Sequence, residues 1–150
     1  MAQSVETTSV SNTKLGKVAR ELYRNQQRWY AYNLKNYRYT LQISCFCTEE
    51  FRQPVIIEVR NGKLKSISRP KGGATIDLEA FERYSTIPKL FNLVKKAIAD
   101  KADRITVSYN PKYGYPTSIS IDQSEMIADE EIYLTISNFQ VISSPFPALR

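Results

Sequence analysis

The sequence predicts an α+β domain in which an antiparallel sheet of about six strands carries two helices on one face, in the order α-β-β-β-α-β-β-β. Three patterns support this class. In Tyr37–Cys47 (YRYTLQISCFC) apolar and polar residues alternate, which is typical of a strand with one buried and one solvated face. Asn61-Gly62 joins two short apolar segments as a hairpin turn. Two amphipathic helical patterns, one ending near Tyr32 and one beginning near Thr86, precede the two sets of strands.

The length of 150 residues suits one domain, which we place at 13–142 between a flexible leader (1–12) and a tail (143–150). The leader lacks the cationic start and apolar centre of a signal peptide, and the apolar runs of the chain are too short to span a membrane. We therefore expect a cytoplasmic protein without a membrane span.

The formal net charge of +6 lies in the first half of the chain. Residues 1–76 hold 13 Lys and Arg against 5 Asp and Glu, whereas residues 77–150 hold 8 against 10. This asymmetry suits an acidic partner, a membrane surface or simple solubility. Nucleic-acid binding is not expected, because the chain has neither a Lys/Arg run nor a recognised nucleic-acid motif.

The chain has no histidine, which excludes Ser-His-Asp and Cys-His catalysis and metal sites that use imidazole. Its two cysteines cannot complete a four-ligand structural zinc site alone. These absences weigh against most hydrolases and metalloenzymes, and no cofactor is expected.

The first helix is expected to begin after Ser11 or Thr13 and to end near Tyr32, with apolar residues at helical spacing along one side. The opposite side carries a basic stripe of four residues, Lys17, Arg20, Arg24 and Arg28. The stripe predicts either a solvated helix surface or a contact with an acidic partner or an anionic surface.

In the first strand, the parity of the pattern separates two rows of side chains. The buried row consists of Tyr37, Tyr39, Leu41, Ile43, Cys45 and Cys47. The solvated row consists of Arg38, Thr40, Gln42, Ser44 and Phe46.

The next two strands form a hairpin around Asn61-Gly62, the preferred pair for a two-residue type I′ turn. This turn sets a register that pairs Val59 with Leu64 on the buried face and Ile56 with Ile67 on the solvated face.

The segment from Arg69 to Glu82 contains one proline and two glycines and predicts a long connection with a short strand near Thr75–Leu78. The second helix begins at Ser85 or Thr86, with Pro88 in its first turn. Its apolar stripe is formed by Ile87, Leu90, Phe91, Val94, Ala97 and Ile98.

Three further strands are predicted at Arg104–Asn110, at Thr117–Asp122 and from Ile132 onward. The loop 111–116 between the first two supplies turn residues. In the last strand, alternation places Tyr133 and Phe139 on the solvated face.

The two halves of the chain contain a weak internal repeat. The segments FRQPVIIEVR and YGYPTSISID place an aromatic residue, a proline and alternating Ile or Val at the same offsets. In this alignment Ile57 corresponds to Ile119, and Val59 to Ile121.

Several segments together resemble a known family: the Trp29–Tyr39 region, the Cys45-Phe46-Cys47 pair, PVIIEVRNGKL, the STIPKLF helix start, VSYNPKYGYPTSISID, and the segment with Asp129 before the final strand. They are similar to the bacterial domain-of-unknown-function family six-one-seven-four over roughly residues 25–142. No activity is established for that family, so the resemblance implies a fold and no reaction.

Many members of that family resemble secreted lipoproteins, but this chain has no lipobox. Members without a signal are cyanobacterial, and this setting suggests a helper in the assembly of a large intracellular complex. The outline is also similar to tandem-repeat inhibitor folds of the beta-lactamase-inhibitor type, which bind other proteins with a sheet face.

Cys45 and Cys47 are the first candidate site. As residues i and i+2 of a strand they would have Cα atoms about 6.5 to 7 Å apart, at the limit for a disulfide. Because they lie in the predicted buried row, we interpret them first as inert core thiols, next as a strained redox pair and last as a metal site.

The second candidate is the loop that carries Tyr113 and Tyr115 around Gly114, which either covers the end of the sheet or contacts a partner. The third is the solvated face of the sheet, which is uncharged and hydrogen-bonding. Its candidate apolar anchors are Phe46, Ile56, Ile67, Tyr133 and Phe139.

Carboxylates are concentrated in two predicted connections, but no spacing among them identifies a general acid/base pair. They are Glu49, Glu50, Asp122, Glu125, Asp129, Glu130 and Glu131.

Together these patterns predict a non-enzymatic module that binds another protein, a component of a large intracellular assembly, through the sheet face and the tyrosine loop. The alternative is a carrier of a small molecule or lipid, which requires a cavity between helices and sheet. An enzyme of unknown type comes third.

Overall fold

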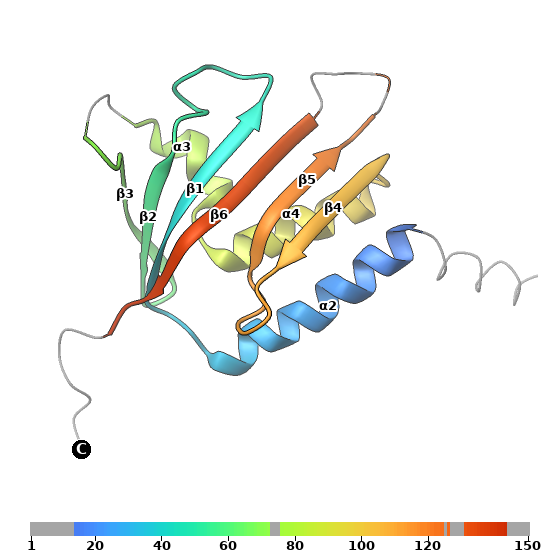
Figure 1. The fold of residues 1–150 in the computed structure, drawn as a ribbon, viewed down its shortest axis with the longest axis horizontal. Helices are drawn as coiled ribbons and strands as arrows, with labels where there is room; N and C mark the ends of the chain where they lie inside the picture. Colours follow the sequence, from blue (N-terminus) through green and yellow to red (C-terminus); the bar gives the residue numbers. More distant parts are fainter. Residues whose placement is uncertain (1–13, 73–75, 125, 127–130, 144–150) are drawn as a thin grey trace, which may run out of the picture.

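A six-stranded antiparallel sheet forms the centre of the structure (Figure 1). The computed structural model describes residues 14–72, 76–124, 126 and 131–143. The strands are β1 (Tyr37–Cys45), β2 (Val55–Arg60), β3 (Lys63–Ser68), β4 (Arg104–Tyr109), β5 (Pro116–Asp122) and β6 (Glu131–Val141). Across the sheet they run in the order β3-β2-β1-β6-β5-β4, so the first and last strands pair at its centre.

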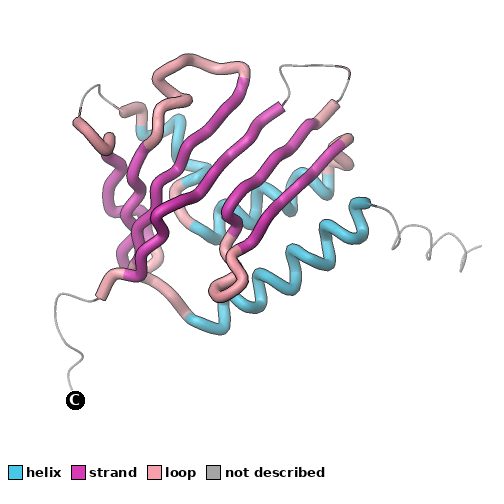
Figure 2. The backbone as a smooth tube through the Cα atoms, in the orientation of Figure 1, coloured by secondary structure: helices cyan, strands magenta, loops and turns pink. Residues whose placement is uncertain are grey.

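The helical segments are α2 (Lys14–Tyr32), α3 (Leu78–Phe81), the 3-10 turn η1 (Glu82–Tyr84) and α4 (Ile87–Ala99). The two long helices, α2 and α4, lie on one side of the sheet (Figure 2). The predicted α+β class and the six-stranded antiparallel sheet are therefore confirmed, and the order of elements is as expected apart from the additional short helical segment.

The core lies between the helices and one face of the sheet, and its centre is the row of β1 that the alternation predicts. Tyr37 is 1% exposed, and Tyr39, Leu41 and Ile43 are fully buried. The middle strands of the two halves, β2 and β5, are the two segments that the internal repeat aligns, and their aligned residues are buried.

Helix α4 begins where the sequence predicts. The hydroxyl of Thr86, the N-cap residue, accepts a hydrogen bond from the backbone N–H of Lys89 at 3.3 Å, and Pro88 lies in the first turn. The predicted apolar stripe is buried against the sheet except for Ile98, which is half-buried.

Two tyrosines of β1 hold the start of α4 against the sheet. The Tyr39 hydroxyl donates to the carbonyl of Tyr84 at 2.8 Å, and the Tyr37 hydroxyl accepts from the N–H of Ile87 at 3.0 Å. Burial raises the pKa of Tyr37 to about 12, because the phenolate would lose its hydration, although the hydrogen bond from Ile87 opposes this effect.

The segment before α4 is helical, and the short strand predicted near Thr75–Leu78 is wrong. Leu78 is the first residue of α3, and the Asp77 carboxylate caps this helix by accepting from the N–H groups of Glu79 and Ala80 at 3.1 and 3.4 Å. Thr75 lies outside the described residues.

A bulge in the β2–β3 hairpin corrects the predicted register. Val59 pairs with Leu64 as expected, but Lys65 is an extra residue, and beyond it Ile67 pairs with Ile57 instead of Ile56. Because one extra residue reverses the parity of a strand, Ile67 packs against the core. The prediction that Ile67 lies on the solvated face is therefore wrong.

A second bulge, between β1 and β6, corrects the position of Phe139. Thr40 pairs with Ser137 but Arg38 pairs with Gln140, so β6 has one residue more than β1 at this point, and Asn138 adopts a φ of 52°. This bulge turns Phe139 onto the helix-covered face, whereas the alternation predicted the solvated face.

The Phe139 ring packs within an aromatic cluster on that face. Its centroid lies 4.2 Å from that of Tyr115, 5.6 Å from that of Tyr37 and 5.9 Å from that of Trp29 in α2. The cluster joins β1, β6, the loop before β5 and the first helix.

The predicted leader and most of the predicted tail lie outside the described residues. Within the described part of the chain, no helix has the length and apolar character needed to cross a membrane.

Candidate functional site

The face of the sheet opposite the helices, which we call the open face, carries short uncharged side chains along the central strands. Register places Thr40 of β1 beside Ser137 of β6, and Ser44 beside Tyr133. Tyr133 in turn pairs with Ser120 of β5. These hydroxyls and the side chain of Gln42, whose amide donates to the carbonyl of Arg52 at 3.4 Å, make the open face a hydrogen-bonding surface.

Of the predicted apolar anchors, three remain accessible. Ile56 pairs with Thr40 on the open face and is half-buried, and Tyr133 is 45% exposed on the same face. Phe46 lies directly after β1 and is 82% exposed, which is unusual for a phenylalanine. The other sheet candidates, Ile67 and Phe139, are on the core side because of the two bulges.

Charged residues border the open face at the β2–β3 side. Glu58 accepts from Arg60 at 2.8 Å, and its other carboxylate oxygen lies 3.6 Å from Arg38. The hydrogen bond from Arg60, followed by the charges of Arg60, Arg38 and Lys65, lowers the pKa of Glu58 against the opposing effect of burial. One carboxylate faces three cations, so this border has an excess of positive charge.

The tyrosine loop packs against α2. Tyr115 is 7% exposed, and its ring meets Trp29 with centroids 6.4 Å apart. Tyr113 is half-buried, and its ring centroid is 4.8 Å from that of Tyr32. Tyr115, predicted as a partner-binding residue, is therefore buried against α2 and offers almost no surface to a partner, and Tyr113 offers only part of its ring.

Gly114 allows this packing. It has a φ of 85°, and a Cβ at this position would lie 2.3 Å from the carbonyl oxygen of Asn25 in α2. Before it, the Asn110 side chain accepts from the N–H groups of Lys112 and Tyr113 at 2.9 and 2.8 Å, which fixes the turn.

The basic stripe of α2 is on the outer side of the helix. Lys17, Arg20 and Arg24 are exposed, whereas Arg28 is half-buried and donates to the Asn25 side chain at 3.1 Å. The stripe and the open face are on opposite sides of the molecule, so one flat partner surface does not contact both.

Cys45 and Cys47 form a disulfide, with Cα atoms 5.3 Å apart. The chain leaves the strand at Cys45, so the straight strand and the Cα distance expected from it do not apply. The interpretation as inert core thiols is therefore wrong. The described part of the chain holds no group of three or more metal-binding side chains.

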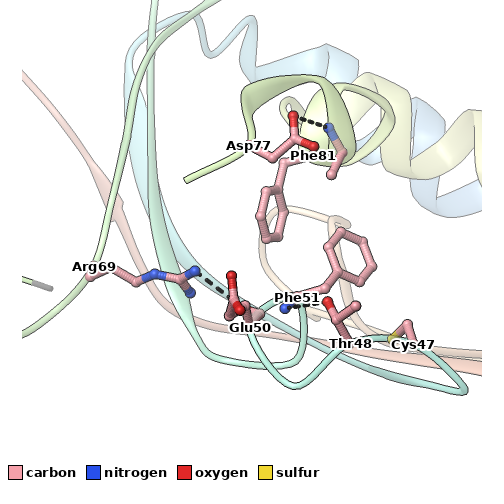
Figure 3. A pocket seen from close by; sticks show the side chains of 8 residues that line it. Cys47, Thr48, Glu50, Phe51, Arg69, Asp77 and Phe81 are labelled. Carbon is pink, nitrogen blue, oxygen red and sulfur yellow. Dashed lines mark hydrogen bonds between the residues drawn. The ribbon is translucent and has the colours of Figure 1, made fainter. Parts of the chain in front are cut away.

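Beside the disulfide is a hollow of about 450 Å³ between the β1–β2 connection and α3 (Figure 3). The rings of Phe51 and Phe81 pack against each other in its wall, with centroids 4.8 Å apart. Arg69 holds one rim by donating to the carbonyl oxygens of Glu50 and Gln53 at 3.2 and 3.4 Å. The hollow lies at the end of the sheet, not between the long helices and the sheet.

The sequence profile of a family of unknown function (DUF6174) matches residues 21–141, from the second turn of α2 to the last residue of β6. The chain belongs to the DUF6174 family. Comparisons with curated proteins and with solved structures find no match. The DUF6174 match contains the whole sheet, the Cys45–Cys47 pair and the tyrosine loop, which agrees with the resemblance of these segments.

Two features of this DUF6174 chain were not predicted from the sequence. One is the hollow, because Phe51, Arg69 and Phe81 lie on three different elements and show no common spacing. The other is a set of three exposed aromatic residues on α2, Tyr23 at 66%, Tyr30 at 54% and Tyr32 at 45%. Of the carboxylates considered, Glu125, Asp129 and Glu130 lie outside the described residues.

Proposed function

We propose that this chain is a non-enzymatic module that binds another protein through the open face of its sheet. The observation that carries the proposal is the one-sided cover of the sheet: within the described residues, both long helices lie on the same side (Figure 2). On the other face, Gln42, Ser44 and Tyr133 are exposed. The partner we propose belongs to a large intracellular assembly.

The chemistry of the open face supports a flat protein partner. Short hydroxyl side chains lose little rotamer freedom when they are covered, and they can donate and accept hydrogen bonds. Tyr133, on the central strand β6, and Ile56, on β2, supply apolar area that can anchor a partner. Such a surface suits a partner with an apolar centre and a polar rim.

The charged border of the open face indicates which sign of charge the rim of the partner carries. Arg38 and Arg60 share the single carboxylate of Glu58, and Lys63 and Lys65 are exposed nearby on β3. A partner with carboxylates at this side would be attracted by the remaining positive charge, which favours encounter and orientation more than affinity.

We expect Tyr133→Ser to weaken capture of the partner at least tenfold, because it removes an exposed aromatic anchor from a central strand of the open face. The matched control is Tyr30→Ser, since Tyr30 is exposed to a similar degree (54% against 45%) but lies on α2, on the other side of the molecule. Both variants replace a tyrosine that the core does not need, so both should keep the circular dichroism spectrum and melting temperature of the parent.

The measurement is affinity capture from native lysate at low salt with quantitative mass spectrometry, followed by titration of the captured protein against each variant. Loss with Tyr133→Ser and retention with Tyr30→Ser supports the open face. Equal loss in both variants, or enrichment of no protein by the parent chain, would contradict the proposal.

A further inference from the structure

The Cys45–Cys47 disulfide closes a loop that contains only one residue, Phe46. A disulfide stabilises a fold by restricting the unfolded chain, and this stabilisation grows with the size of the loop that it closes. A loop of one residue therefore gives very little stabilisation. The fold has an extensive apolar core that needs no such staple. A structural role therefore accounts poorly for this bond.

The surroundings of the two cysteines differ. Cys45 ends β1, pairs with Ile132 of β6 and packs against the core. Cys47 lies beyond the strand and lines the hollow beside Phe51 and Phe81 (Figure 3). Cys47 is thus the cysteine that a molecule entering the hollow would meet first.

The hollow combines an apolar wall with a charged rim. The facing rings of Phe51 and Phe81 form the wall, and Glu50, Arg69 and Asp77 supply both signs of charge. This combination suits a peptide-like molecule, whose apolar side chain contacts the rings while its backbone polar groups remain at the rim.

We propose that the Cys45–Cys47 pair is a thiol–disulfide exchange site that accepts two electrons from a thiol substrate, a cysteine-containing peptide segment or a low-molecular-weight thiol, bound in the hollow. Exposed disulfides are the kind that exchange, whereas structural disulfides resist reduction. Cys47 is partly exposed and lines the hollow, so its sulfur is within reach of a bound thiol. The inference is independent of the open face and does not rest on the proposed binding function.

The exchange proceeds in two balanced steps. A substrate thiolate attacks the Cys47 sulfur, a substrate–Cys47 disulfide forms, the Cys45–Cys47 bond breaks, and Cys45 leaves as a thiolate that takes a proton from water. A second substrate thiolate, from the same molecule or another, then attacks the substrate sulfur of the mixed disulfide. The substrate becomes a disulfide, Cys47 leaves as a thiolate and is protonated, and the pair has gained two electrons and two protons.

The test uses the full chain, first oxidised with excess oxidised glutathione and then mixed with reduced probes under native conditions, with acid quench, alkylation and mass spectrometry at each time. The probes are reduced glutathione and two short dithiol peptides that differ only in a Phe or a Ser beside the first cysteine. We expect the Phe peptide to reduce the pair at least about tenfold faster than the Ser peptide, because its ring occupies the hollow. If glutathione is as fast as the Phe peptide, the substrate is a low-molecular-weight thiol.

Two single variants test which sulfur is attacked. With the same peptides in their oxidised form, Cys45→Ser retains Cys47, which lines the hollow. It should form a mixed disulfide at least about tenfold faster than Cys47→Ser, which retains Cys45 at the end of β1 against the core. The double variant should melt within about 4 °C of the oxidised parent, because the short loop contributes little to stability.

Three results would overturn the proposal. The first is a pair that stays as two thiols in excess oxidised glutathione. The second is a disulfide that no probe reduces until the chain is unfolded by denaturant. The third is a large loss of melting temperature in the double variant, which would show that the bond is a structural staple.

Discussion

Gly114→Ala is expected to lower the free energy of unfolding by roughly 3–5 kcal/mol. The new Cβ would lie 2.3 Å from the carbonyl oxygen of Asn25 and 3.0 Å from the Cβ of Arg28, and the φ of 85° is unfavourable for any L-residue with a side chain. Neither obstacle is the flexible end of a side chain, so the loop must move away from α2. Tyr115 would then lose its contacts with Trp29 and Phe139.

The matched control is Gly72→Ala. Gly72 has a similar φ of 71°, but no described atom lies within 4 Å of the position of a new Cβ. This variant should therefore show only the cost of the left-handed conformation, about 1–2 kcal/mol. Denaturant unfolding of both variants measures the two losses, and equal values would show that the loop does not press on α2 at Asn25.

Alkaline pH is expected to destabilise the fold through its buried tyrosines. In the unfolded chain a tyrosine loses its proton near pH 10, whereas burial holds the pKa of Tyr37 at about 12 and that of Tyr39 well above 10.0. The unfolded state is therefore favoured as soon as its tyrosines ionise. The stability that these residues contribute is fully present below pH 10 and is lost as the pH rises through the folded-state pKa.

For Tyr37 the difference between a pKa of about 12 and the ordinary 10.0 corresponds to roughly 3 kcal/mol. The measurement is the free energy of unfolding between pH 8 and pH 12, together with the absorbance of tyrosinate, which should rise for the buried tyrosines only as the chain unfolds. Tyr39→Phe is the informative variant. It loses the hydrogen bond to Tyr84 at every pH, about 1 kcal/mol, but its stability should fall less steeply above pH 10. Ionisation of Tyr37 near pH 10 in a chain that stays folded would contradict this account.

The sequence predicts best the features that depend on neighbouring residues. The alternation in β1 predicts its buried row, Asn61-Gly62 predicts the hairpin, and Thr86 with Pro88 predicts the start of α4. Each signal is complete within a few residues, so no knowledge of the partner strand or helix is needed.

The failures have a common physical cause in strand pairing. The extra residues in β3 and β6 reverse the parity of the strand residues beyond them, and neither Lys65 nor Asn138 is marked by a glycine. A bulge is defined against the partner strand, and so Ile67 and Phe139 could not be placed from their own segments. Helix α3 was not predicted, because four residues are too few to show a helical period.

The positions of the candidate residues in the fold were predicted in part. Tyr133 and Ile56 are on the open face as predicted, because the pairing of their strands contains no bulge at those positions. The sequence left two roles open for the tyrosine loop, because its rings suit either a contact with a partner or packing within the fold. The close approach of Gly114 to Asn25 shows that the loop packs against α2. The disulfide forms because β1 ends at Cys45. The alternating pattern continues to Cys47 and so predicted a strand that is two residues too long.

The pairing of β1 with β6 also determines when the fold can be completed. β1 is the first strand in the chain, and its partner β6 lies about ninety residues later. During synthesis β1, β2 and β3 therefore emerge as a half-sheet in which the β6-facing edge of β1 is unpaired. Such long-range closure is slow compared with hairpin formation. The nascent chain therefore exposes the hydrogen-bonding edge of β1 until its last strand arrives, and truncation before β6 would leave two half-sheets with no shared centre.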